Sequence, residues 1–144
     1  MQVARQGTTL VVRLDSGDDL FARLVEISRA ERIGAGIVVS GIGMLRDLEL
    51  GYYDGSTYQR REFREPHELV ALHGSIARVE EAPSLHLHAG LAGPDHRLVG
   101  GHLFRARVEI LNEILLETFP GRTFGRPEIS PGLRALDLGP TPPT

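Results

Sequence analysis

The sequence has no cysteine, no excess of basic residues and no long apolar run. Without cysteine, disulfide bonds and thiolate metal sites are excluded, so any transition-metal site must use histidine and carboxylate ligands. The same absence fits a reducing compartment. The sequence also lacks the basic segment followed by an apolar stretch that is typical of a secretion signal. No apolar run approaches the length of a membrane span. We therefore expect a cytoplasmic protein that does not enter a membrane.

The balance of charge argues against a large nucleic-acid surface. Lysine and arginine total 16 and aspartate and glutamate total 19, which gives a formal net charge of -3. Proteins that bind DNA through its phosphates normally present a basic surface, because lysine and arginine release condensed counterions. Arg60, Arg61 and Arg64 form the one basic cluster. Glu62 and Glu65 interleave with it, so we interpret this segment as a solvated, charged connection between strands.

Length and composition are typical of one soluble domain, with 144 residues, 41% hydrophobic and 24% charged. A chain of this length buries about 68–70% of its unfolded surface, so folding requires neither a disulfide nor a metal. Proline and glycine become frequent after Pro120. We predict a domain over residues 1–136 and a disordered, proline-rich end over residues 137–144.

Short segments rich in β-branched and apolar residues predict mostly strands. They cover residues 8–14, 36–43, 47–53, 68–79 and 84–91. Residues 20–31 have apolar residues at helical spacing and predict a helix, with Ser16 and Asp19 approximating a capping box and Gly34 fitting the end. Residues 108–119 fit either a helix or a strand. The predicted fold class is α+β, a single compact domain with a largely antiparallel β-sheet and one or two packed helices.

The glycines between residues 34 and 43 do not complete a nucleotide-binding motif. Neither Gly34-x-Gly36 nor Gly41-x-Gly43 is followed by a glycine three residues later. Gly36 and Gly41 have the spacing of a phosphate-binding loop, but Ile42 occupies the position of its lysine. We interpret these glycines as permitting turns, bulges or close approach of the backbone.

Three of the six histidines, His86, His88 and His102, lie in one short region. Residues i and i+2 of a strand point to the same face, so His86 and His88 project together while the neighbouring leucines face the core. Imidazoles about 6–7 Å apart along a strand can converge on one zinc ion at about 2.0–2.1 Å. A turn over residues 93–96 would return His102 on the neighbouring strand as a third ligand, leaving a fourth position open for water or substrate.

A second interpretation of these histidines stays open at this point. Histidines that alternate with leucines also occur on the half-solvated face of an ordinary sheet. His73 lies in another predicted strand and either reaches the same site or lines it.

Several short motifs follow one another in a recognisable order. They are Ser40-Gly41-Ile42-Gly43, Leu50-Gly51-Tyr52-Tyr53-Asp54, Glu68-Leu69-Val70-Ala71-Leu72-His73-Gly74, Pro83-x-x-His86-x-His88 and Gly100-Gly101-His102-Leu103. Over residues 8–119 the chain thereby resembles the "plants and prokaryotes conserved" (PPC) domain family. The resemblance implies an α+β domain that forms a homotrimer, and it favours a strand over residues 108–119. It also matches His86, His88 and His102 to the metal ligands proposed for the family, with zinc or a similar divalent metal as the cofactor.

The same resemblance implies a DNA-binding or regulatory role. In plants the domain accompanies AT-hook segments, and prokaryotic members, usually the domain alone, are often labelled DNA-binding. An AT-hook has the core Arg-Gly-Arg-Pro, whose arginines enter a narrow A·T minor groove. Here Phe124 precedes Gly125-Arg126-Pro127, so we interpret this tripeptide as part of the tail of the domain.

The histidine spacing is also similar to the zinc site of acetolactate decarboxylase. There the metal acts as a Lewis acid on a 2-hydroxy-keto acid. This similarity implies an alternative function, a metal-dependent lyase or hydrolase that binds a small carboxylate or keto acid at the metal. Glu68 is the candidate catalytic acid, and the other interpretation of Glu68 is an exposed carboxylate at a strand end.

Overall fold

The structure, a computed structural model, describes residues 1–140 as nine strands and one helix. In chain order they are β1 (Gln2–Gln6), β2 (Thr9–Asp15), α1 (Leu20–Ala30), β3 (Gly36–Tyr53), β4 (Tyr58–Phe63), β5 (His67–Val79), β6 (Ala82–Ala92), β7 (Leu98–Thr118), β8 (Glu128–Ser130) and β9 (Leu133–Arg134). The predicted α+β class with a largely antiparallel sheet is confirmed, with one helix among these residues. That helix has 11 residues and is too short to cross a bilayer.

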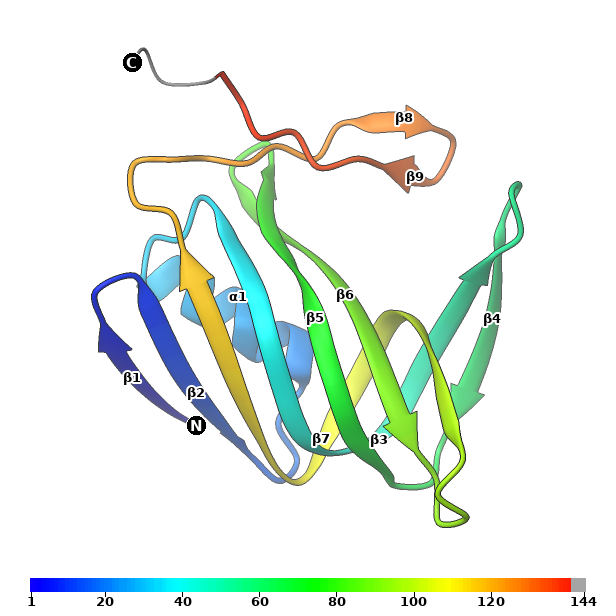
Figure 1. Cartoon of the computed structure of the whole chain (residues 1–144). Coiled ribbons are helices and arrows are strands. Elements are labelled where there is room, and N and C mark those ends of the chain that lie inside the picture. The colour runs from blue at the N-terminus through cyan, green and yellow to red at the C-terminus, as the bar shows by residue number, and fades with distance from the viewer. Residues whose placement is uncertain (141–144) are drawn as a thin grey trace.

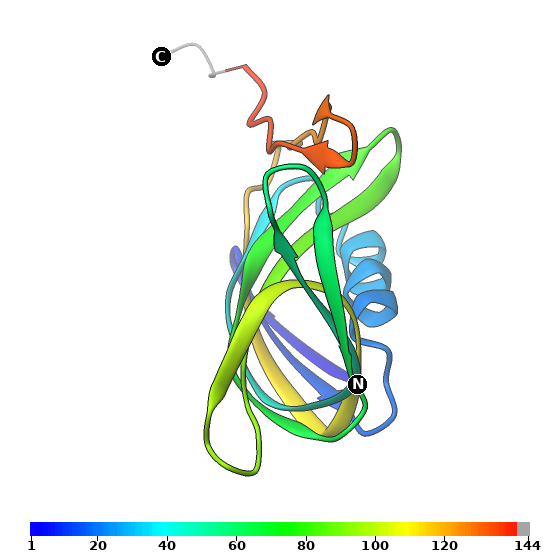
Figure 2. The same ribbon diagram turned by 90° about the vertical axis from the view of Figure 1, so that its right-hand side faces the viewer.

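Seven strands form one antiparallel sheet in the order β1-β2-β7-β6-β5-β3-β4, with an additional pairing of β7 with β3. Because β3 pairs with both β5 and β7, and β6 lies between β5 and β7, these four strands form a closed circuit of pairings. The hairpin of β1 and β2 extends this circuit beyond β7, and β4 extends it beyond β3 (Figure 1). The helix lies along one side of the sheet. Figure 2, turned by 90° from Figure 1, shows the helix beside the strands.

The core follows from alternation in the strands and from one apolar stripe of the helix. In β2, Leu10, Val12 and Leu14 are fully buried while the residues between them are exposed. The helix adds Leu20 and Leu24, which are also fully buried. Each such side chain stabilises the fold by about 1.5–3 kcal/mol relative to an exposed position. One continuous apolar cluster therefore joins the helix to the sheet.

The helix begins and ends on residues that differ from those predicted. Asp19 is the N-cap, and its carboxylate accepts a hydrogen bond from the main-chain N–H of Ala22 at 2.9 Å. Ser16 has no part in the cap, and the helix ends at Ala30, with Arg32 rather than Gly34 taking the left-handed conformation (φ 53). Gly34 has another role: a Cβ there would lie 2.8 Å from the carbonyl oxygen of Arg122.

Two predicted boundaries in the sheet were wrong. The segments 36–43 and 47–53 form one 18-residue strand, β3, interrupted by register shifts rather than by a turn. The charged segment that follows, predicted as a connection, contains the edge strand β4, which pairs with β3. Charged residues are common on edge strands, because they discourage pairing with other chains, and this masks the strand pattern.

The C-terminal part of the chain crosses over one end of the sheet and carries the short pair β8–β9 (Figure 1). It is fastened to the rest of the domain at Phe124, whose N–H donates to the carbonyl of Gly34 at 3.0 Å and whose carbonyl accepts from the N–H of Arg78 at 2.8 Å. Phe124 packs into a second small apolar cluster with Ala35 and Ala77. The domain boundary after residue 136 stays a prediction, and residues 141–144 of the predicted disordered end lie outside the described residues.

Candidate metal centre

The three histidines predicted as ligands meet on one face of the sheet. His102 on β7 pairs directly with His88 on β6, and His86 lies two residues from His88 on the same strand. Residues directly opposite each other in an antiparallel pair share a face. The connection between β6 and β7 contains the expected turn, where His96 N–H donates to the carbonyl of Gly93 at 2.9 Å. The sheet register therefore gathers side chains that lie up to 16 residues apart (102 − 86).

Their geometry is compact enough for one ion. The ring centroids lie 5.0 Å apart for His86 and His88, 4.9 Å for His86 and His102, and 5.4 Å for His88 and His102. One ring nitrogen from each residue lies within 4.8 Å of the others, and Nε2 of His86 is 3.1 Å from Nε2 of His88. Nitrogens bound to a tetrahedral zinc at about 2.0–2.1 Å lie about 3.3 Å from one another. The separation of the His86 and His88 nitrogens is already close to this value.

Burial keeps two of these rings neutral. Desolvation lowers the pKa of His102 to about 4, with further contributions from the neighbouring histidines and from Arg60 and Arg126. Desolvation also lowers the pKa of His86, and the charge of Arg126 acts in the same direction. A neutral imidazole is the form that binds a metal. In addition, Nδ1 of His102 is buried without a hydrogen-bond partner among the described residues.

Glycines allow the strands around this group to approach closely. A Cβ at Gly74 on β5 would lie 2.0 Å from the carbonyl oxygen of His86. A Cβ at Gly101, beside His102, would lie 2.7 Å from the carbonyl oxygen of Gly51 on β3. No real side chain tolerates such contacts, so both positions need glycine to keep β6 and β7 in place.

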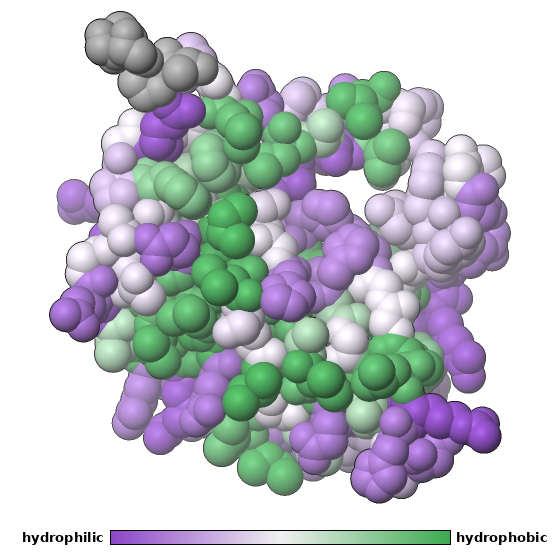
Figure 3. All heavy atoms as spheres, in the orientation of Figure 1, coloured by the Kyte–Doolittle hydropathy of each residue, from purple (hydrophilic) through white to green (hydrophobic). Residues whose placement is uncertain are grey.

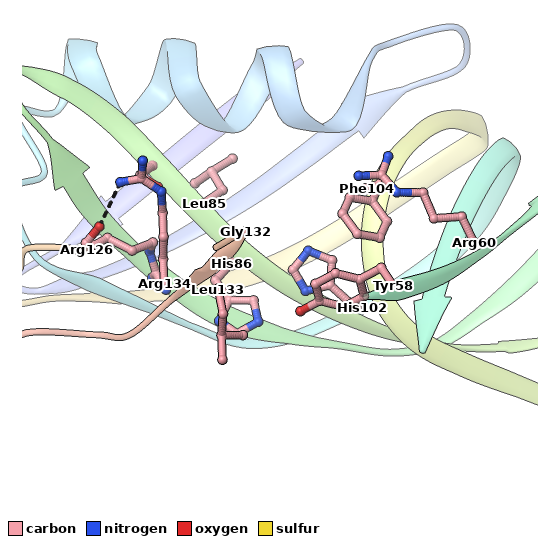
Figure 4. Close-up of a pocket in the computed structure, with 11 residues that line it drawn as sticks. Tyr58, Arg60, Leu85, His86, His102, Phe104, Arg126, Gly132, Leu133 and Arg134 are labelled. Carbon is pink, nitrogen blue, oxygen red and sulfur yellow. Dashed lines mark hydrogen bonds between the residues drawn. The ribbon is translucent and has the colours of Figure 1, made fainter. Parts of the chain in front are cut away.

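A cavity of about 240 Å³ adjoins the histidines. Figure 4 shows Tyr58, Arg60, His102 and Phe104 on one side of it and the tail residues Arg126 and Arg134 on the other. The cavity is lined by Tyr58, Arg60, Ser84, Leu85, His86, His102, Phe104, Arg126, Gly132, Leu133 and Arg134. It therefore lies between the sheet and the C-terminal segment that crosses its end.

Residues of β4 and of the tail were missed as parts of this site. The guanidinium carbon of Arg60 lies 3.8 Å from the centre of the Phe104 ring, and the Tyr58 ring lies 5.0 Å from that of His102. The predicted solvated connection thus contributes one wall of the cavity. Arg126 and Arg134 contribute the other, and only the long-range folding of the tail brings them there.

Glu68 and His73 are not members of the three-histidine group. Glu68 is exposed near the start of β5, where it pairs with Ala92. His73 pairs with His88 across the sheet, and its Nδ1 lies 2.8 Å from the carbonyl oxygen of Val39. His73 thus lines the face beside the site, and the catalytic role of Glu68 stays a prediction.

Comparison with known proteins identifies the family. The family model of the Plants and Prokaryotes Conserved (PCC) domain matches residues 1–120. This is the same domain as the PPC domain named above. The chain belongs to this family. No curated protein matches this PPC-domain protein.

Solved structures share its fold over nearly the whole chain. A metal-containing protein from Archaeoglobus fulgidus is 32% identical, with a TM-score of 0.81 over 90% of this chain and 92% of that one. A PPC protein from Pyrococcus horikoshii is 26% identical, with a TM-score of 0.81 over 92% and 91% of the two chains. A protein from Bacteroides thetaiotaomicron, described as a candidate DNA-binding protein, is 25% identical, with a TM-score of 0.86 over 95% and 96%.

Proposed function

We propose that this PPC-domain protein binds a divalent metal, zinc or a similar ion, through His86, His88 and His102. The observation that carries the proposal is the convergence of three ring nitrogens within 4.8 Å on one sheet face. The metal-containing relative from Archaeoglobus fulgidus, at 32% identity, supports it. Three protein ligands leave one position of a tetrahedral ion open, where the metal can polarise a bound oxygen.

The partial burial of two of the three histidines favours this proposal over ordinary surface histidines, although His88 is exposed. His86 and His102 are half-buried, and both have a pKa below the usual histidine value. Histidines on a solvated sheet face are not desolvated in this way, because water forms hydrogen bonds with their ring nitrogens. A bound metal would instead compensate the desolvation of these partly buried imidazoles.

Metal analysis of purified protein tests the proposal. We expect about one zinc or similar ion per wild-type chain, either as purified or after dialysis against zinc, and none in His86→Ala/His88→Ala. His96→Asn is the matched control, because His96 is exposed in a turn at φ 60, which asparagine tolerates. A wild type that takes up no ion, or a folded double variant that still binds one, would refute the metal centre.

We also propose that the protein assembles as a homotrimer. Large apolar side chains remain exposed on the sheet face opposite the helix, among them Val39 (41%), Ile42 (53%) and Val70 (51%). Figure 3 shows apolar side chains over β3 and β5, the strands that carry these residues. Extended apolar patches are rare on monomeric proteins and are typical of protein interfaces, which supports self-association.

A DNA-binding or regulatory role is proposed on a narrower basis. The Bacteroides thetaiotaomicron relative is described as a candidate DNA-binding protein. The net charge of -3 means that binding would need a local cationic surface. The test is retardation of duplex DNA that weakens steeply with added salt, and absence of retardation at low salt would refute the role.

The alternative of a metal-dependent lyase or hydrolase is not favoured. None of the three relatives above is described as an enzyme, and Glu68 is not among the residues that gather at the histidines. The cytoplasmic location stays a prediction from the sequence.

A further inference from the structure

Arg126 is a buried cation without an anionic partner. Its residue is only 6% exposed, and among residues 1–140 no carboxylate forms an ion pair with it. Nη2 donates to the hydroxyl oxygen of Ser75 at 2.6 Å, while Nε is buried and makes no hydrogen bond. Arginine stays charged in proteins, so this burial leaves a positive charge that only one neutral hydroxyl compensates.

The other two arginines of the cavity are compensated. Arg60 pairs with Glu49 at 3.3 Å, and Arg134 approaches Glu128 at 3.7 Å. Arg134 also donates to the carbonyl oxygen of Arg126 at 3.1 Å, which fixes the main chain of the tail beside the cavity (Figure 4). A buried unpaired charge is strongly destabilising, so its retention at Arg126 points to a ligand that supplies the missing negative charge.

The cavity next to Arg126 suits a small anion with an apolar part. Three arginines line it, and among residues 1–140 no aspartate or glutamate does. Leu85, Phe104 and Leu133 give it apolar walls. At about 240 Å³ it is smaller than the roughly 300–1,000 Å³ of sites for drug-sized ligands, which limits the occupant to a small molecule.

We propose that this cavity binds a small organic acid, whose carboxylate pairs with the guanidinium of Arg126 while its apolar part packs against Leu85 and Leu133. A guanidinium binds a carboxylate through paired, charge-assisted hydrogen bonds, and here Nε has no competing partner. His86 and His102 line the same cavity, so a bound acid lies beside the proposed metal. This adjacency rests on the proposed function, whereas the anion site itself requires no metal.

Titration calorimetry of metal-free protein at low salt tests the anion site. The probes are benzoate, its neutral counterpart benzamide, and inorganic phosphate. We expect saturable binding of benzoate and none of benzamide, because the carboxylate makes the decisive contact. Phosphate that binds more tightly than benzoate would overturn the assignment to an organic acid. Because the protein is metal-free, the result is independent of whether the histidines hold an ion.

Arg126→Met is the decisive variant. It keeps the length of the side chain and removes the charge, so benzoate affinity should fall at least about tenfold. Replacing an unpaired buried charge by an apolar side chain should leave the melting temperature unchanged or raise it, which a purely structural arginine would not do. Arg97→Met is the matched control, because the side chain of Arg97 is 88% exposed and lies in the β6–β7 turn.

A second variant keeps the test valid if Arg126→Met does not fold. Leu133→Trp enlarges a cavity wall on β9 without touching the charge, and it should abolish benzoate binding by filling the space. The proposal is overturned if wild type shows no saturable benzoate binding, or if a folded Arg126→Met or Leu133→Trp binds benzoate as tightly as wild type.

Discussion

At the scale of single residues, Gly74 allows β5 to approach closely the strand that carries His86 and His88. A Cβ at this site would lie 2.0 Å from the His86 carbonyl oxygen and 2.8 Å from Cδ2 of Leu87. Gly74→Ala must therefore push β6 away from β5. We expect a loss of stability of about 1–3 kcal/mol or more and weaker zinc binding, measured by urea unfolding and by zinc titration.

The control for this substitution lies on the same pair of strands. At Gly90 on β6 an added Cβ would meet only Ala71 Cβ, at 3.8 Å, which is ordinary contact. Gly90→Ala should leave zinc binding intact and change stability by less than about 1 kcal/mol. Equal behaviour of the two alanine variants would contradict the close-approach argument.

Sequence could predict the histidines of the site but not its arginines. His86, His88 and His102 carry a local signal, since histidine is infrequent and the i, i+2 spacing fixes a common face. Arg126 carries none, because an arginine in a glycine- and proline-rich tail is ordinary until the tail buries it. Its significance depends on its burial and on its lack of an ion pair with any carboxylate of residues 1–140, which are properties of the folded chain.

At the scale of elements, the turn between β3 and β4 depends on the charge of Asp54. Its carboxylate accepts hydrogen bonds from the main-chain N–H groups of Ser56 and Thr57, each at 2.9 Å, and from the side chain of Gln59 at 2.7 Å. The hydrogen bond from Thr57, followed by those from Gln59 and Ser56, lowers the pKa of Asp54. This turn positions β4, which supplies one wall of the cavity.

The pH dependence of the hairpin follows from that shift. The pKa of Asp54 is lower in the folded state than its ordinary value of 3.8, so the ionised group stabilises the turn fully above pH 3.8. The contribution is lost as the pH falls below 3.8 toward the folded pKa. Asp54→Asn should therefore be less stable than wild type at pH 7, and the difference should shrink near pH 3.

Tyrosine signals give a direct measurement of this effect. The chain has no tryptophan, and its three tyrosines, Tyr52, Tyr53 and Tyr58, all lie in β3 or β4. Thermal melts followed by near-ultraviolet circular dichroism thus report on the hairpin. Asp95→Asn, in the β6–β7 turn, should leave these melts nearly unchanged. A pH-independent difference between wild type and Asp54→Asn would contradict the electrostatic explanation.

The helix and some strands could be predicted from the sequence, and other strands could not. The helix and the strands with alternating burial were correctly placed, because periodicity reports directly on which face is buried. β1 and β4 were missed, because all five residues of β1 are exposed and β4 is charged along an edge. The closed circuit of β3, β5, β6 and β7 depends on bulges inside two long strands, and no local pattern specifies their register.

At the scale of the whole molecule, the exposed apolar face is the proposed trimer interface. Ile42 is 53% exposed on β3, so a change there should spare the fold of the chain. Wild type should sediment as a trimer. Ile42→Glu should shift it toward the monomer, because a charge buried in an apolar interface without a partner is costly. Sedimentation velocity at several protein concentrations measures this shift.

Leu98→Glu is the matched control for assembly. Leu98 is 69% exposed, but it lies at the first residue of β7, far along that strand from Glu113, which pairs with Ile42. The control should remain trimeric and keep its zinc. A monomeric wild type would refute the trimer without affecting the metal centre. A trimeric Ile42→Glu would instead exclude the surface around Ile42 and direct the search for the interface to another exposed apolar face.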